Sequence, residues 1–132
     1  MDQFEVGQTF FLGIKITEKM IADFIDLSGD TAPLHIDEEF ARSKGFNGRL
    51  VHGALLVALT SRFVGLHLPG PSCVWLRADT KFHEPCYAPE EIQIEGKISQ
   101  ISEAASSLAV DISITNSKRV AIATIKSFHK IL

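Results

Sequence analysis

Hydrophobic residues repeat with two different periods along the first part of the chain. Over 10–16 they alternate with other residues, which is typical of a half-buried strand. After Thr17, which can cap a helix, apolar residues recur at helical spacing up to Gly29. A shorter helix is predicted over 38–44, with Asp37 as its cap. The N-terminal part is therefore expected to fold as one strand followed by helices.

The segment 52–68 is apolar nearly all round. A helix without a polar face must be buried on most sides, so we expect this helix at the centre of the fold. The turn 69–71, Pro-Gly-Pro, ends it. The longest apolar run, 53–59, is far shorter than the roughly 20 residues that span a bilayer. No membrane association is expected.

The rest of the chain has a period of two, which predicts four strands. They cover 74–82, 92–98, 108–114 and 120–128. The last two are joined by a turn over 116–119, and Gly96 is expected to form a bulge or a bend. One strand, then helices, then four strands predict an α+β fold with an antiparallel sheet of about five strands. A single long apolar helix needs a sheet curved around it, as in the hot dog fold, although the periodicity alone does not separate this fold from other α+β folds.

Composition narrows the class of protein further. The 132 residues fit one domain, and 45% hydrophobic with 22% charged residues excludes intrinsic disorder. A net charge of -3 argues against a nucleic-acid binder. Two cysteines, Cys73 and Cys86, favour reduced thiols over a disulfide. With an acidic N-terminus and no secretory signal, the chain is expected in the cytoplasm.

One short segment, Ser-Gly-Asp-Thr-Ala-Pro-Leu-His-Ile-Asp over 28–37, carries candidate chemistry. Pro33 forbids a continuous helix between Asp30 and His35, so the chain must turn and both side chains can converge. A carboxylate beside an imidazole is a competent acid/base pair near neutral pH. The residues alone equally allow Asp30 to cap a turn and His35 to satisfy a backbone group.

A second candidate lies where the long helix begins, at Val51-His52-Gly53. The first amides of a helix lack internal partners and carry partial positive charge. The Gly53 amide is therefore a candidate oxyanion hole, although a packing role for this glycine fits equally well. The other three histidines have no acidic or cysteine partner at metal-ligand spacing, and a metal site is not expected. These are His67, His83 and His129.

Taken together, S-G-D-x-x-P-L-H-x-D, then V-H-G and the apolar helix, resemble the MaoC-like dehydratases, and most closely the short (R)-specific enoyl-CoA hydratases. The resemblance runs from about Phe24 to the C-terminus. It implies a single hot dog domain over 1–132 that pairs as a homodimer through its sheet edges. It also implies reversible addition of water to a trans-2-enoyl thioester, giving the (R)-3-hydroxyacyl thioester.

The resemblance implies roles for individual residues. Asp30 and His35 match the catalytic pair that activates one water, and Gly53 matches the residue whose amide binds the thioester carbonyl. Ser61 matches a serine beside the substrate, although an ordinary polar helix residue is an open alternative. Coenzyme A enters only as part of the substrate, and no other cofactor is implied. Four basic residues are candidates for its phosphates: Arg49, Arg62, Arg77 and Lys81.

Two positions depart from the family pattern, which has asparagine at Ala32 and proline at Glu38. The missing amide at Ala32 implies lower activity or a different thioester preference. An acyl-carrier-protein dehydratase is an alternative function, because these motifs do not distinguish the carrier and the reaction runs both ways. A thioesterase or an acyl-thioester binding module on the same fold is another. Hot dog thioesterases generally carry a carboxylate on or near the long helix, and 54–66 contains none.

Overall fold

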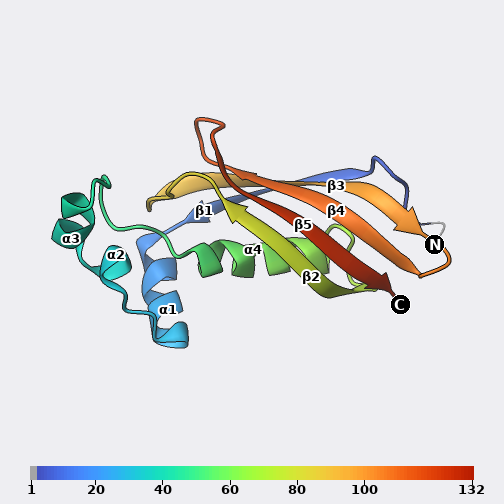
Figure 1. Ribbon diagram of the computed structural model, residues 1–132, viewed down its shortest axis with the longest axis horizontal. Coiled ribbons are helices and arrows are strands. Elements are labelled where there is room, and N and C mark those ends of the chain that lie inside the picture. The colour runs from blue at the N-terminus through green and yellow to red at the C-terminus, as the bar shows by residue number, and fades with distance from the viewer. Residues whose placement is uncertain (1–2) are drawn as a thin grey trace.

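The structure, a computed structural model, describes residues 3–132. Its elements are β1 (Thr9–Ile16), α1 (Glu18–Ser28), α2 (Pro33–Ile36), α3 (Glu38–Ser43), α4 (Gly53–Leu66), β2 (Cys73–Phe82), β3 (Glu90–Ser102), β4 (Ser107–Thr115) and β5 (Ala121–Ile131). The five strands form one sheet that curves over α4, and α1 to α3 cluster beyond one end of that helix (Figure 1). The predicted α+β hot dog fold is confirmed.

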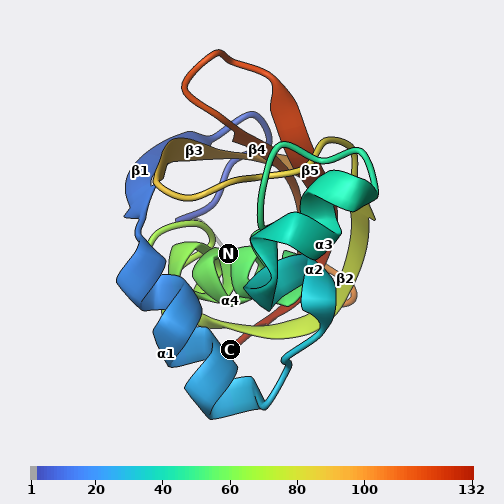
Figure 2. The same cartoon turned by 90° about the vertical axis from the view of Figure 1, so that its left-hand side faces the viewer.

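Every pairing in the sheet is antiparallel, and the strand order is β1-β3-β4-β5-β2. The three central strands follow one another in the chain, whereas β1 and β2 occupy the two edges. Figure 2, viewed along α4, shows the sheet arching over this helix with β1 and β2 on opposite sides. The connection from β1 to β2 therefore carries all four helices across the open side of the sheet.

Local capping signals fix both ends of α1 and the start of α3, as predicted. Thr17 Oγ1 accepts a hydrogen bond from the Met20 amide at 3.2 Å, and Gly29 ends α1 with a positive φ of 72°. Asp37 Oδ1 caps α3 by accepting from the Phe40 amide at 3.0 Å. The turn expected around Pro33 is a one-turn helix, α2, which begins at this proline because its fixed φ suits the first helical position.

The hydrophobic core lies between the sheet and one side of α4. Its centre is Phe63, which is fully buried and faces Gly96 of β3. A β-carbon on Gly96 would lie 2.6 Å from the Phe63 ring, so this glycine makes room for the ring. Of the bulge or bend expected at Gly96, the bulge is wrong: the register shift in β3 falls between Ile98 and Gln100, and Gly96 pairs regularly with Ile112. The bend stays a prediction.

The expectation that α4 is buried on most sides holds for only part of its surface. Leu56, Phe63 and their neighbours are buried, but Ala58 and Ser61 are exposed and Leu66 is 65% exposed. The sheet wraps one side of the helix and leaves the other open in the single chain. Packing in the core of one chain therefore does not account for all the apolar residues of α4.

Two further expectations concern membranes and cysteines. None of the helices within 3–132 is long and apolar enough to cross a membrane. Cys73 and Cys86 are both free thiols, as predicted.

His129 on β5 is buried and is expected to make stability depend on pH. Its Nε2 lies 2.7 Å from Ser127 Oγ, and burial lowers its pKa from 6.5 to about 4. Between these values the unfolded chain binds a proton that the folded chain does not, so the free energy of unfolding falls as pH falls.

We expect His129 to lower the free energy of unfolding by about 2 kcal/mol between pH 7 and pH 4.5. Urea unfolding at both pH values measures it, and His129→Gln should reduce the loss. The same pH dependence in both proteins would contradict this account.

Candidate active site

The loop between α1 and α2 holds Asp30 through its own backbone. Asp30 Oδ1 accepts a hydrogen bond from the Ala32 amide at 3.1 Å, and the Asp30 amide donates to Ser28 Oγ at 3.1 Å. The Ala32 carbonyl in turn accepts from the His35 amide at 2.9 Å. Backbone groups of Ala32 thus brace this loop without a side-chain amide. The second carboxylate oxygen of Asp30, Oδ2, is directed to His35.

His35 is oriented by a backbone carbonyl. Its Nδ1 lies 2.8 Å from the Leu50 carbonyl oxygen, which can only accept, so Nδ1 carries the proton of the neutral ring. This leaves the lone pair on Nε2, which lies 3.9 Å from Asp30 Oδ2. One water oxygen fits within hydrogen-bond distance of both atoms. The prediction that the side chains of Asp30 and His35 converge is confirmed, and their catalytic role stays a prediction.

Gly53 is the first residue of α4, and its amide precedes the first intrahelical hydrogen bond. It lines a pocket of about 390 Å³ together with His35. The other lining residues are Phe46, Leu50, Val51, Leu56, Phe82, His83, Glu84, Pro85 and Cys86. A β-carbon on Gly53 would lie 2.8 Å from the Phe82 ring. The group that closely approaches this glycine in the structure is therefore an aromatic side chain. The pocket therefore brings His35, a helix-start amide and an apolar wall together, while Asp30 lies beside His35 but does not line the pocket.

Ser61 does not line this pocket. It is exposed on α4, about two helical turns beyond Gly53, so its predicted place beside the substrate stays a prediction. The basic candidates for binding phosphate do not line the pocket either. Arg49 pairs with Glu18 at 2.7 Å and Arg77 pairs with Asp79 at 3.0 Å.

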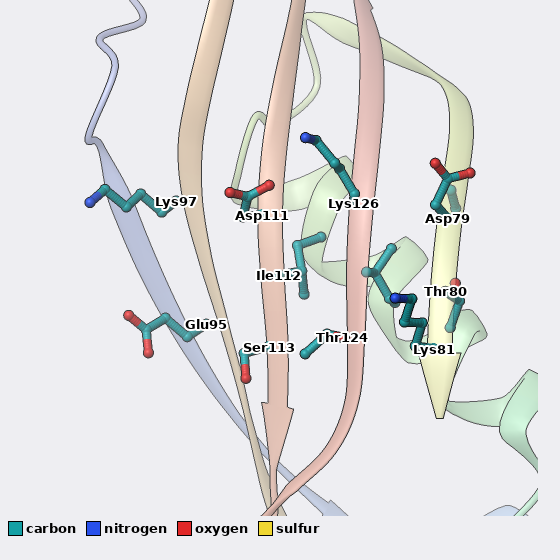
Figure 3. Close-up of a pocket in the computed structure, with 12 residues that line it drawn as sticks. Asp79, Thr80, Lys81, Glu95, Lys97, Asp111, Ile112, Ser113, Thr124 and Lys126 are labelled. Atoms are coloured by element: carbon teal, nitrogen blue, oxygen red, sulfur yellow. The ribbon is translucent and has the colours of Figure 1, made fainter. Parts of the chain in front are cut away.

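A larger hollow of about 920 Å³ lies on the outer face of the sheet (Figure 3), and neither Asp30 nor His35 lines it. Its floor is a row of alternating charges across four strands: Lys97, Asp111, Lys126 and Asp79 are register partners in that order. Opposite charges on neighbouring strands stabilise a solvated sheet by a few tenths to about 1 kcal/mol per pair. Lys81, the last phosphate candidate, lies here. We assign this hollow to the solvated outer face of the sheet.

Sequence reasoning missed His52, which precedes α4 and is 1% exposed. Its ring stacks on His35 with centroids 3.8 Å apart and an angle of 20° between the planes. Ligand atoms of Asp30, His35 and His52 lie within 4.8 Å of one another, a spacing that could hold a metal ion. The lone pairs of stacked imidazoles lie in nearly parallel planes, however, and do not converge on one ion. In the sequence, the only indication that His52 belongs to the site is its position next to the glycine that begins the helix.

Cys86 also lines the pocket and is buried. Burial, with a smaller contribution from Glu90, raises the pKa of its thiol to about 11. The thiol is therefore protonated near neutral pH, where only a thiolate is a good nucleophile. Its place in the site is that of a small apolar wall residue.

Comparisons with known proteins converge on one family. The family model described as "MaoC like domain" matches residues 3–118. The chain is 34% identical over 99 residues to an (R)-specific enoyl-CoA hydratase of Aeromonas caviae, covering 75% of this chain and 74% of that protein. It is 39% identical over 72 residues to a mitochondrial 3-hydroxyacyl-[acyl-carrier-protein] dehydratase of Arabidopsis thaliana, covering 54% of this chain and 42% of the relative.

The fold has a solved counterpart in an (R)-hydratase from A. caviae involved in PHA biosynthesis. The two structures superpose with a TM-score of 0.92 at 28% identity, and each chain is covered in full. Similarity thus extends over the whole described sheet and all four helices.

Proposed function

Because the chain belongs to the MaoC-like domain family, we propose that it catalyses the (R)-specific hydration of trans-2-enoyl-CoA to (R)-3-hydroxyacyl-CoA and the reverse dehydration. Such an enzyme is a hydro-lyase, as are the hydratases and dehydratases to which the chain is similar. The observation that carries the proposal is the separation of 3.9 Å between Asp30 Oδ2 and Nε2 of His35, a residue that lines the same pocket as Gly53.

In this proposal Asp30 and His35 hold one water between them. The water oxygen bonds to C3 of the enoyl group, and its proton passes through the pair to C2, so the elements of one water are added. Negative charge develops on the thioester oxygen during the attack, and the Gly53 amide stabilises it at the start of α4. Ser61 belongs to the proposal as a residue that the substrate reaches farther along the helix.

The proposed reaction needs no cofactor beyond the coenzyme A of its substrate. The electrophile is a backbone amide, and the base is the Asp30–His35 pair. The stacked arrangement of His35 and His52 also disfavours a shared metal ion. Addition of water to a double bond also includes no redox step, so the proposed reaction needs no redox group.

The runner-up is the same chemistry on an acyl-carrier-protein thioester, supported by the similarity to the Arabidopsis dehydratase. The residues that carry the reaction are common to both carriers, so only the carrier differs. The third candidate, a thioesterase or binding module, is disfavoured because 54–66 of α4 carries no carboxylate.

Crotonyl-CoA provides the direct test of the proposed function. Loss of the conjugated double bond is followed by absorbance, and the stereochemistry of the product is determined by coupling to an (R)-specific dehydrogenase. Hydration giving the (R)-product supports the proposal. Release of free coenzyme A thiol would favour the thioesterase, and turnover of a crotonyl carrier protein alone would favour the runner-up.

We also propose that the protein is a homodimer joined along β2. This edge strand presents exposed apolar side chains, with Val74, Leu76 and Phe82 between 46% and 62% exposed. An unpaired apolar strand edge is an aggregation hazard unless another strand covers it. Phe82 also lines the candidate site, so a second copy on β2 would lie close to the substrate.

Leu76→Lys is expected to convert the dimer to a monomer at micromolar concentration, because the two-fold axis would bring two like charges together in an apolar interface. Light scattering after size exclusion measures the mass. Phe11→Lys is the matched control, since Phe11 is 53% exposed on the opposite edge strand, β1. A monomeric wild-type protein, or dissociation by the control alone, would rule out pairing through β2.

A single domain over 1–132 and a cytoplasmic location complete the proposal. One continuous cluster of buried residues supports the first, and the two free thiols support the second.

A further inference from the structure

His52 links the two proposed catalytic residues to the start of α4. Its Nε2 lies 3.2 Å from the backbone carbonyl oxygen of Asp30, and one face of its ring stacks on His35. Phe24 of α1 packs against the same ring, with centroids 4.9 Å apart. We propose that His52 is a positioning residue that holds Asp30 and His35 in the geometry of the reaction. This inference rests on the proposed hydratase function.

The hydrogen bond defines the state of the His52 ring. A carbonyl oxygen only accepts, so Nε2 carries the proton and donates a hydrogen bond to the Asp30 backbone carbonyl. In the neutral ring Nδ1 then has a lone pair, and this atom is buried without a hydrogen-bond partner among the residues described. A buried acceptor without a partner costs stability. An apolar residue would serve the fold better here, which points to a role for this histidine at the site.

The two contacts restrain different parts of the site. The hydrogen bond from Nε2 holds the backbone at Asp30, which lies on an exposed loop. The stacked ring limits the tilt of His35, whose other restraint is the bond from Nδ1 to Leu50. Because Gly53 is the next residue after His52, the same segment also carries the proposed oxyanion amide. His52 thus fixes the acid/base pair relative to the amide that polarises the substrate.

Three substitutions separate the two contacts. His52→Leu removes both. His52→Gln keeps a hydrogen-bond donor about as far from the backbone as Nε2 but loses the ring. His52→Phe keeps a flat ring but loses the donor. Since a misplacement of about 1 Å costs on the order of a hundredfold in rate, we expect His52→Leu to lower kcat on crotonyl-CoA about 100-fold. KM should change less than about threefold, because the substrate pocket is unchanged. Gln and Phe should each recover part of kcat, roughly tenfold.

His67→Leu is the matched control. His67 also stacks on an aromatic ring, that of Phe10 at 4.6 Å, but it lies at the far end of α4. The kcat of the His67→Leu variant should equal that of the wild type. Thermal unfolding of every variant shows whether each one folds. As a readout independent of turnover, the NMR resonance of the His35 ring should lose the ring-current shift of its neighbour in His52→Leu and retain one in His52→Phe.

The outcomes are distinguishable. An inactive wild-type protein overturns the proposed function, and the inference with it. An active wild type whose kcat is unaffected by His52→Leu overturns the inference alone. Equal losses in all three variants, or a loss confined to KM, would reduce His52 to a packing residue and overturn it as well.

Discussion

Asp30→Asn and His35→Asn are each expected to lower kcat for enoyl-CoA hydration by about 10² to 10⁴-fold without unfolding the protein. An asparagine in place of Asp30 retains an oxygen that accepts from the Ala32 amide, and one in place of His35 retains a donor for the Leu50 carbonyl. The loop therefore keeps its hydrogen bonds, while the groups that accept and return the proton are lost. Steady-state kinetics on crotonyl-CoA and circular dichroism measure the two expectations.

Asp37→Asn is the matched control for this pair. Asp37 belongs to the same short segment, but its carboxylate caps α3 by accepting from the Phe40 amide, and asparagine serves as a helix cap equally well. Its kcat should remain at the wild-type level. Near-normal turnover in a folded Asp30 or His35 variant would remove the proposed mechanism.

Gly96→Ala is expected to cause the largest loss of stability of any single methyl group added to the sheet. The new β-carbon would lie 2.6 Å from the Phe63 ring and 3.2 Å from Val110, and both side chains are fully buried. Overpacking of this kind costs about 1–3 kcal/mol. Urea unfolding at equilibrium measures the loss.

Gly13→Ala is the control for this substitution, because Gly13 also lies in a strand but has no atom within 4 Å of the added carbon. It should be neutral or slightly stabilising, since alanine loses less backbone entropy on folding. Phe63→Leu should relieve the clash, so the double variant with Gly96→Ala should be less destabilised than the sum of the single variants. Equal stability of the two glycine variants would contradict the packing role of Gly96.

Sequence reasoning succeeded where the signal is local. Thr17, Gly29 and Asp37 lie at helix ends because caps depend on a few neighbouring residues. The same holds for Asp30 and His35, which one turn of chain brings together.

Where the deciding contact comes from far along the chain, the sequence prediction was wrong or incomplete. A glycine in a strand fits a bulge and a close contact equally well, and only the position of Phe63 on α4 distinguishes them. His52 was missed because nothing in its neighbourhood shows that its ring stacks on His35. The open side of α4 depends on how far the sheet curves, which the period of apolar residues does not encode.

The strand order has a consequence for how the molecule folds. β3, β4 and β5 are joined by short connections and form a meander of local contacts, whereas each edge strand pairs with a partner far away in sequence. Closing those long loops costs entropy before any contact is gained, so low-contact-order hairpins are favoured early and the edges dock late. Asp30, His35 and Gly53 of the candidate site lie in the part of the chain between the two edge strands. This region can therefore open by local unfolding while the meander stays folded, and its amides should exchange hydrogen sooner than those of the central strands.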